Sequence, residues 1–257
     1  MLQFPSNELL LLRSVILLSF YEEICKYYDF IFPVGRAQVS FITDVAGKPP
    51  KALLDVACGT GGYSLELAKQ GYALTAIDLD AQMIELLKAK FSEKSDVKVL
   101  QGDMLELSQK LDSKYDLAFC IGNSLVHLNG EKEIEKFFSE AKALLVDEGN
   151  LVIQIINYDR VLAKNIDSLP TIEDKDIGLK FERFYRYDSN LSKIFFKTTL
   201  KVAGKELVNE IPLQPILSDK IVELLRNTGF NKIQLFGDFK RSKFDKNSSY
   251  ALVLVAS

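Results

Sequence analysis

The chain has few of the residues that build disulfide frameworks or zinc sites. Its 257 residues include three cysteines and one histidine. Cys25, Cys58 and Cys120 form an odd set, which predicts no disulfide framework and fits a reducing, cytoplasmic compartment. With one histidine and no Cys-x-x-Cys pair, the sequence has too few soft ligands for a zinc site, so we expect no bound metal.

The chain also lacks a long apolar run and a strong charge of one sign. The apolar stretch at 9–20 contains Arg13, is too short to span a bilayer and has no positive flank of the secretory kind. We interpret it as the start of a helix and expect no membrane partner. The formal net charge of −3 gives no broad attraction to phosphate backbones, so we expect no nucleic-acid partner.

An apolar strand pattern runs directly into a glycine turn that opens a helix. The segment reads Leu53-Leu54-Asp55-Val56-Ala57-Cys58-Gly59-Thr60-Gly61-Gly62. Glycines let the backbone approach a ligand closely, and the free N–H groups of a helix N-terminus favour polar or anionic atoms. The next apolar run, 72–77, ends at Asp78, at the spacing typical of a carboxylate that holds a ribose. This pattern predicts a ligand that contains a ribose.

A missing glycine selects among the ribose-containing ligands. A dinucleotide fingerprint, G-x-G-x-x-G, that started at Gly59 would need a glycine where the chain has Ser64. NAD is therefore disfavoured as the ligand, and an NAD-dependent oxidoreductase remains only as a poorer alternative.

Apolar runs alternate with helical patterns, which is typical of βαβ units around a parallel sheet. The expected strands are 51–57, 72–77, 97–100, 115–121, 150–156, 232–236 and 250–255. The expected helices are 61–70, 81–91, 131–145 and 219–228, the third closed by a turn at 147–150. Two alternating runs, 181–187 and 194–202, predict an antiparallel hairpin between the two halves of the sheet.

Three segments together resemble a known family. The run Asp55-x-x-Cys58-Gly59-x-Gly61 resembles motif I of the class I S-adenosylmethionine (SAM) dependent methyltransferases. The segments 101–104 and 115–124 follow where that family has its adenine-side acidic residue and its motif IV. The resemblance implies an α/β, Rossmann-like sheet of seven strands, the last antiparallel, with an antiparallel hairpin inserted after the fifth strand. We expect residues 1–45 to form a helical segment over the cofactor site, residues 46–257 to form the SAM-binding domain, and the hairpin insertion to occupy 179–213.

Shorter stretches are similar to the glycine N-methyltransferases and related small-molecule methyltransferases. They are 55–61, 122–128 and 157–162. The likeness implies in-line transfer of a methyl group from SAM to an N, O or C atom of a small molecule, with S-adenosylhomocysteine (SAH) as the product. A SAM-binding module without catalysis is the alternative, and the oligomeric state is left open.

The resemblance also implies roles for individual residues. It implies Arg36 for the methionine carboxylate, the backbone of Ala57 and Gly59 for its amino group, Asp78 for the ribose and Asp103 with Met104 for the adenine. The other expected cofactor residues are Tyr28, Asp55, Thr60, Gly61, Leu79, Met83 and Cys120. Asn123 and His127 are expected to face the acceptor, with His127 as the candidate base; a local packing role for this histidine is an equal alternative.

One position departs from the glycine methyltransferases. There an arginine precedes the Asn-Tyr-Asp segment and binds the carboxylate of the amino acid, whereas this chain has Ile156. An aliphatic side chain cannot make the charge-assisted fork that recognises a carboxylate. The sequence therefore predicts that glycine and sarcosine are poor acceptors and favours neutral, aromatic or simple amine acceptors. The rival interpretation is that Arg160 or Arg183 reaches the same space from another backbone position.

Overall fold

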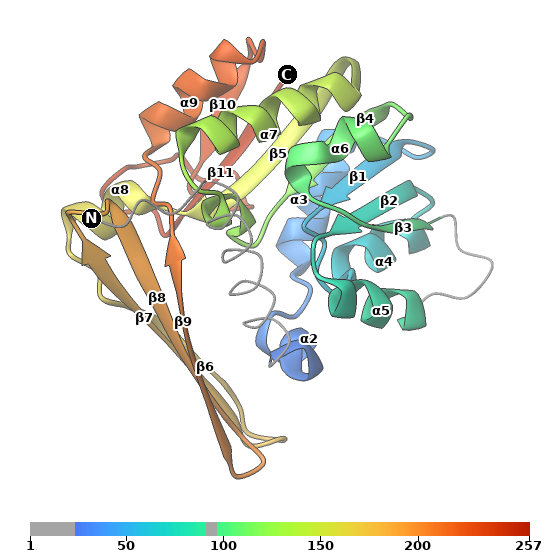
Figure 1. The fold of residues 1–257 in the computed structure, drawn as a ribbon. Coiled ribbons are helices and arrows are strands. Elements are labelled where there is room, and N and C mark those ends of the chain that lie inside the picture. The colour runs from blue at the N-terminus through green and yellow to red at the C-terminus, as the bar shows by residue number, and fades with distance from the viewer. Residues whose placement is uncertain (1–23, 91–96) are drawn as a thin grey trace.

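The fold is built on a seven-stranded sheet (Figure 1). The computed structural model describes residues 24–90 and 97–257, so the apolar stretch at 9–20 lies outside the described residues. In chain order the sheet strands are β1 (Ala52–Val56), β2 (Ala73–Asp78), β3 (Val97–Gln101), β4 (Tyr115–Cys120), β5 (Leu145–Ile156), β10 (Ile233–Phe236) and β11 (Ala251–Ala256). Their order across the sheet is β10-β11-β5-β4-β1-β2-β3.

The direction of the strands confirms the fold class predicted from the sequence. Strands β1 to β5 pair in parallel with their neighbours, and β11 is antiparallel to both β5 and β10. Parallel strands place their carboxyl ends along one edge of the sheet, where ligands of open α/β folds bind. The glycine turn after β1, Asp78 at the end of β2 and the turn after β4 therefore share this edge.

Helices cover both faces because successive strand side chains point to opposite sides. The longer helices are α3 (Arg36–Ala46), α4 (Gly62–Lys69), α5 (Ala81–Lys90), α7 (Glu131–Leu144) and α9 (Ser218–Asn227). Short segments are α2 (Tyr28–Ile31), α6 (Leu107–Lys110), α8 (Tyr158–Ala163) and the 3-10 turns η1 (Cys25–Tyr27), η2 (Met104–Glu106) and η3 (Ser124–His127). One core joins the sheet to α7 and α9, and the other joins it to α3 and α4. No helix among residues 24–90 and 97–257 is both long and apolar enough to cross a membrane.

The predicted hairpin is the centre of a larger, four-stranded antiparallel sheet. Strands β7 (Leu179–Asp188) and β8 (Lys193–Val202) match the two predicted runs, and β6 (Ser168–Asp174) and β9 (Lys205–Leu213) extend them on each side. The outer strands contain Pro170 and Pro212. Proline cannot donate a ladder hydrogen bond and is tolerated mainly at sheet edges. A proline within a short run therefore argues against a strand, and the sequence pattern predicts only the two central strands.

The start of β5 differs from the sequence prediction. The expected turn at 147–150 lies inside the strand, which already begins at Leu145, directly after α7. Tyr115 of β4 pairs with Leu145, whereas Leu117 pairs with Asn150, so the strand bulges between these pairs. Glu148 adopts a positive φ of 62° within the bulge. The polar residues that suggest a turn therefore form an irregular strand.

Asn157 ties the end of β5 to the segment before β11. Its Nδ2 donates to the carbonyl oxygens of Asp245, Lys246 and Ser249 at 3.3, 3.0 and 2.9 Å, and its Oδ1 accepts from the Arg160 N–H at 3.2 Å. The side chain is 1% exposed. Buried carbonyl groups that lose a donor retain the cost of their desolvation. Asn157 therefore fixes the geometry of the sheet edge at the carboxyl end of β5.

We expect Asn157→Ala to lower the free energy of unfolding by about 2–4 kcal/mol, because the mutation removes the buried amide and three partly buried carbonyl groups lose their donor at once. Urea denaturation followed by circular dichroism measures this. Asn190→Ala, at an exposed position of the β7–β8 turn, is the control and should change stability by less than about 0.5 kcal/mol. Equal losses in the two variants would contradict the role assigned to Asn157.

Candidate active site

Two cavities meet at the carboxyl edge of the main sheet. The Asp78 cavity, about 490 Å³ with its open mouth, is lined by Val56, Ala57, Ile77, Asp78, Leu79, Gly102, Asp103, Met104, Ser124 and His127. The Asp55 cavity, about 940 Å³ with its open mouth, is lined by Tyr28, Asp29, Phe32, Pro33, Val34, Gln38, Asp55, Ala57, Cys58, Thr60, Gly62, Tyr63, Ile121, Gly122 and Gln154. Ala57 lines both cavities. Together they form one elongated site on either side of the glycine turn.

Three left-handed residues shape the turn after β1. Ala57, Gly59 and Gly61 have φ values of 57°, 55° and 72°. A Cβ at Gly59 would lie 3.0 Å from the Tyr28 hydroxyl, and one at Gly61 would lie 1.9 Å from Cδ1 of Leu87. Glycine is needed at position 61 both for its backbone conformation and for the close packing of the turn on α5.

The turn is joined to the end of β2 through Asp78. The Gly59 N–H donates to Asp78 Oδ2 at 2.7 Å, and the Asp80 N–H donates to Oδ1 at 2.9 Å. The neighbouring Asp55, 3% exposed, accepts a 2.7 Å hydrogen bond from the Ser64 hydroxyl. Ser64, the residue that breaks the dinucleotide pattern, thus has a structural partner at the end of β1.

Asp55 is buried and Asp78 is partly buried, and neither has a cationic partner among the described residues. Burial raises the pKa of Asp55 to about 7, against a hydrogen bond from Ser64, and proximity to Asp78 raises it further. Burial likewise raises the pKa of Asp78 to about 6, although backbone N–H groups oppose the shift. Neither carboxylate forms an ion pair with a lysine or arginine in the described part of the chain. Such a site favours a ligand with cationic groups and hydroxyl donors.

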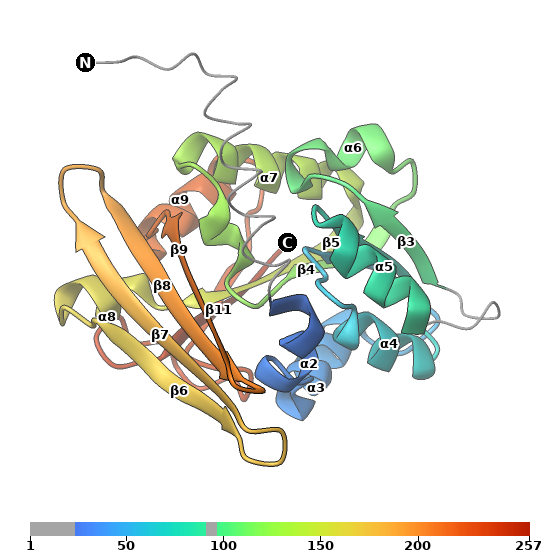
Figure 2. The same cartoon turned by 60° about the horizontal axis from the view of Figure 1, so that its bottom comes forward.

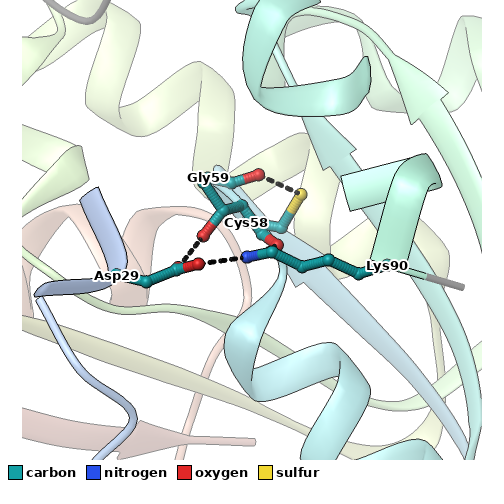
Figure 3. A network of polar contacts seen from close by, with 5 residues as sticks. Asp29, Cys58, Gly59 and Lys90 are labelled. Atoms are coloured by element: carbon teal, nitrogen blue, oxygen red, sulfur yellow. Dashed lines mark hydrogen bonds and ion pairs between the residues drawn. The ribbon is translucent and has the colours of Figure 1, made fainter. Parts of the chain in front are cut away.

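The N-terminal helix α2 covers the glycine turn. Asp29 of α2 points toward Lys90 at the end of α5, across the turn that contains Cys58 and Gly59 (Figure 3). Lys90 Nζ also donates to the Thr60 carbonyl at 3.1 Å, and the Thr60 hydroxyl donates to Asp29. Helix α2 and the end of α5 are thereby connected to each other and to the glycine turn.

The two residues expected to face the acceptor lie in different surroundings. The Asn123 amide is engaged by the protein: its Oδ1 accepts from the Ile156 N–H at 2.9 Å and its Nδ2 donates to the Tyr158 hydroxyl at 3.1 Å. His127, in η3, lines the Asp78 cavity together with Asp103 and Met104. Asn123 therefore connects the turn after β4 to the end of β5, while His127 lies at the other end of the site.

Most of the predicted cofactor residues come together at the two cavities. Tyr28, Asp55, Ala57, Thr60, Asp78, Leu79, Asp103 and Met104 line one or both of them. Gly59 and Gly61 form the turn itself. Cys120 and Met83 are buried side chains that line neither cavity, and burial raises the pKa of the Cys120 thiol.

Arg36 is the predicted residue that lies farthest from its expected role. It is exposed and lines a separate hollow with Glu66 and Gln70, on the outer side of α3 and α4. Gln38, two residues later, lines the Asp55 cavity instead. Because α3 begins at Arg36, residues 36 and 38 point in different directions from the first turn of the helix, and Gln38 is the one that faces the Asp55 cavity.

Sequence reasoning did not select several residues that line the site. Gln154 Oε1 accepts a hydrogen bond from the Gly122 N–H at 2.8 Å. Gln154 also lines the Asp55 cavity, together with Phe32 and Tyr63. A glutamine between apolar residues of a buried strand is the one signal in the sequence that singles out Gln154. Phe32 and Tyr63 have no such signal, because aromatic residues are common in cores.

Comparisons with known proteins agree with this geometry. A family model described as a methyltransferase domain matches residues 53–149. The chain is 28% identical over 229 residues to a glycine/sarcosine N-methyltransferase of Halorhodospira halochloris, covering 88% of this chain and 83% of that protein. It is also 28% identical over 206 residues to the glycine/sarcosine/dimethylglycine N-methyltransferase of Actinopolyspora halophila, covering 79% of this chain. That match spans about a third of the second relative, 35% of its length.

Solved structures share the fold over nearly the whole chain. A SAM-dependent methyltransferase from Clostridium acetobutylicum superposes with a TM-score of 0.77 at 17% identity, covering 92% of this chain and 98% of that one. The CcbJ methyltransferase from Streptomyces caelestis has a TM-score of 0.74 at 22% identity, covering 91% and 95%. The family model and the sequence relatives support a class I SAM-dependent methyltransferase, and the solved structures together with the strand order show the fold of that class.

We expect Gly61→Ala to lower the free energy of unfolding by about 2–4 kcal/mol, the sum of a left-handed backbone penalty and overlap with Leu87. Gly178→Ala is the matched control, because Gly178 also has a positive φ, 63°, but a Cβ there would meet nothing within 4 Å. It should cost only about 1–2 kcal/mol. Chemical denaturation of both variants gives the comparison, and a loss at Gly61 no larger than at Gly178 would contradict the packing argument.

Proposed function

We propose that this enzyme binds SAM across the two cavities and methylates an N, O or C atom of a small molecule by in-line transfer. The observation that carries the proposal is the pair of carboxylates, Asp55 and Asp78, on either side of a turn that lies at the carboxyl edge of the sheet. Bound SAM supplies a methyl group activated by a positively charged sulfur. A cationic ligand with a ribose would give these two carboxylates the positive charge and the hydroxyl donors that the described part of the protein does not provide.

The residues of the Asp78 cavity suit the adenosine part of the cofactor. We assign Asp78 to the ribose hydroxyls, because its carboxylate is held in place by two backbone N–H groups. Asp103, whose Oδ1 accepts the Leu105 N–H at 2.9 Å, and Met104 would lie beside the adenine. Since His127 lines the same cavity, we assign it a positioning role at the adenosine in preference to that of a base for the acceptor.

The Asp55 cavity suits the methionine part of the cofactor. The backbone of Ala57 and Gly59 and the side chains of Asp55 and Tyr28 are the candidates for holding it. The carboxylate of the methionine needs a donor, and Gln38 is placed for this where Arg36 is not. The proposed Arg36 contact requires its side chain to leave the outer hollow.

The chain contributes to the reaction mainly by holding the two reactants in line. Gln154 fixes the Gly122 N–H, and Asn123 fixes the end of β5, so the wall at the carboxyl ends of β4 and β5 is rigid. Positioning of this kind is worth up to about 7–11 kcal/mol in favourable intramolecular reactions. A small amine acceptor is consistent with the glycine and sarcosine activities in the names of the relatives.

Cofactor choice is the direct test. In calorimetry the purified protein should bind SAH and not NAD, because Asp78 requires a ribose and the third dinucleotide glycine is absent. Asp78→Asn should weaken SAH binding by about 1.5–3 kcal/mol, the range for hydrogen bonds to a charged group. Asp176→Asn, at an exposed position between β6 and β7, is the matched control and should keep full affinity. Binding of NAD alone would overturn the assignment, and an unchanged affinity of Asp78→Asn would remove Asp78 from the site.

The raised pKa values of the two carboxylates predict opposite trends for binding and stability. Cationic SAM binds the ionised carboxylates, so its affinity should rise from pH 5 to 8. The rise should reach about tenfold per pH unit between about 6 and 7, where one carboxylate is protonated, and be steeper below about 6, where both are. In the free protein both groups hold protons more tightly than in the unfolded chain. Their contribution to the free energy of unfolding therefore falls as the pH rises from about 4 to about 7.

Calorimetric titrations with SAM and urea denaturation of the ligand-free protein, each at several pH values, measure the two trends. Asp78→Asn should flatten the acid part of the affinity profile. A SAM affinity that stays constant between pH 5 and 8 would show that the two carboxylates do not face the positive charges of the cofactor.

A further inference from the structure

Two arginines outside the cofactor cavities lack an acidic partner. Arg160 lies on α8 and Arg183 on β7, and the Nε atom of each is buried without a hydrogen-bond partner. Neither forms an ion pair within residues 24–90 and 97–257. Burial lowers the pKa of the Arg183 guanidinium, which shows that this charge is poorly solvated.

Both guanidinium groups converge on Tyr250. The Arg160 guanidinium lies 5.3 Å from the centre of the Tyr250 ring, and a hydrogen bond with Tyr250 partly offsets the lowered pKa of Arg183. Tyr250 is fixed at the end of β5, because its carbonyl accepts the Asn157 N–H at 3.1 Å. Segments that are far apart in the sequence thus bring two positive charges together beside the carboxyl end of β5.

The face of β7 that carries Arg183 is turned toward the proposed active site. Side chains two residues apart share a face of a strand, so Phe181, Arg183 and Tyr185 lie on the same side. The Phe181 ring packs edge-on at 6.0 Å from Phe32, which lines the Asp55 cavity. The Tyr185 ring lies 6.4 Å from Tyr158.

Arg183 therefore lies between two contacts of β7. On one side Phe181 packs on Phe32 of the Asp55 cavity, and on the other Tyr185 packs on Tyr158, which binds Asn123 in the turn after β4. In Figure 2, α2 lies between the β6–β9 sheet and helices α4 and α5. Through the contact of Phe181 with Phe32, this face of β7 lies beside the Asp55 cavity.

A guanidinium with a free Nε–H offers the fork geometry that matches an anionic oxygen pair. Two contacts already orient the Arg183 side chain: Nη2 donates to the Pro170 carbonyl at 2.6 Å, and the guanidinium hydrogen-bonds Tyr250. Two like charges held together at partial burial are costly unless an anion lies between them.

We propose that Arg183 and Arg160 form an anion-binding subsite for the methyl acceptor, which therefore carries a carboxylate or phosphate group. The proposal rests on the proposed function and favours the second of the two interpretations of Ile156: the cation comes from β7 and α8 and not from position 156. It selects small acceptors with an anionic group over neutral and purely aromatic ones.

Anion binding is tested first without a methyl acceptor. The protein saturated with SAH is unfolded thermally in sodium acetate, in sodium phosphate, and in sodium chloride at the same ionic strength. We expect acetate or phosphate to raise Tm above the chloride value, and the effective anion identifies the acceptor group. Arg183→Met and Arg160→Met should each abolish the increase.

The matched control is Arg186→Met, on the opposite face of β7, where Arg186 pairs with Glu210 at 3.6 Å and stacks on Phe195 at 4.3 Å. This variant should keep the full anion response. If Arg183→Met does not fold, Arg183→Lys retains the charge without the fork and should weaken the anion at least about fivefold. No specific anion effect in the unmodified protein, or an equal effect in Arg183→Met, overturns the proposal.

A second measurement separates the acceptor from the cofactor, which has a carboxylate of its own. Calorimetry should give Arg183→Met the SAH affinity of the unmodified protein within about twofold. A loss of tenfold or more would assign the anion to the methionine carboxylate and overturn the proposal. If the unmodified protein bound no SAH, the proposed function would fail, which is a different result from a missing anion effect.

Methyl transfer from labelled SAM completes the test with acceptor pairs that differ in the anion. The pairs are glycine with glycinamide, and aminomethylphosphonate with methylamine. We expect turnover of the anionic member of a pair, with KM raised at least about tenfold in Arg183→Met and unchanged in Arg186→Met. Preferred use of the neutral members would overturn the proposal, and where no member reacts, the anion titrations decide it.

Discussion

The hydrogen bond from the Gly59 N–H to Asp78 Oδ2 connects the parts on which the site depends. It joins the turn after β1 to the end of β2, at 2.7 Å. The turn can reach this position only because Ala57, Gly59 and Gly61 take left-handed backbone angles and because Gly61 packs directly on Leu87. Backbone strain at Ala57 and two carboxylates without a cationic partner are thus concentrated at the joined ends of β1 and β2. Such local costs are tolerated where the surrounding fold holds the segment in place, and they are typical of ligand sites.

The main sheet and the convergence of residues at its carboxyl edge could be predicted because their signals are local. A strand followed by glycines, and an acidic residue at the end of the next strand, depend on residues that are close in sequence. The sheet then brings Asp55, Asp78 and Asp103 to one edge, since β1, β2 and β3 run in parallel and all end there. Once the fold class is known, the place of such a residue in the structure follows from its position at the end of a strand.

The remainder depends on contacts between distant segments, which a single sequence does not report. Arg36 has the motif position of a cofactor residue, yet the start of α3 turns it outward and places Gln38 at the cavity. Asn123 has the position of an acceptor residue, yet its amide binds Ile156 and Tyr158, two residues of the next strand and helix. The prolines in β6 and β9 weaken the strand pattern, so the two outer strands of the second sheet are not predicted from the sequence. In each case tertiary packing overrides the local pattern.

The second sheet and the main sheet divide the work of the enzyme between them. The residues that we propose to hold the cofactor lie on β1, β2 and the turns after them, whereas Arg183 and Tyr185 belong to the inserted sheet. The two parts share one hydrophobic core and also meet through aromatic contacts, Phe32 with Phe181 and Tyr158 with Tyr185. Arg183 is only half-buried, so its side chain can change with less loss of core packing than those of Phe181 or Tyr185. Acceptor choice can therefore vary by substitution in the inserted sheet, while the turn at Gly59 and the carboxylate of Asp78 stay fixed.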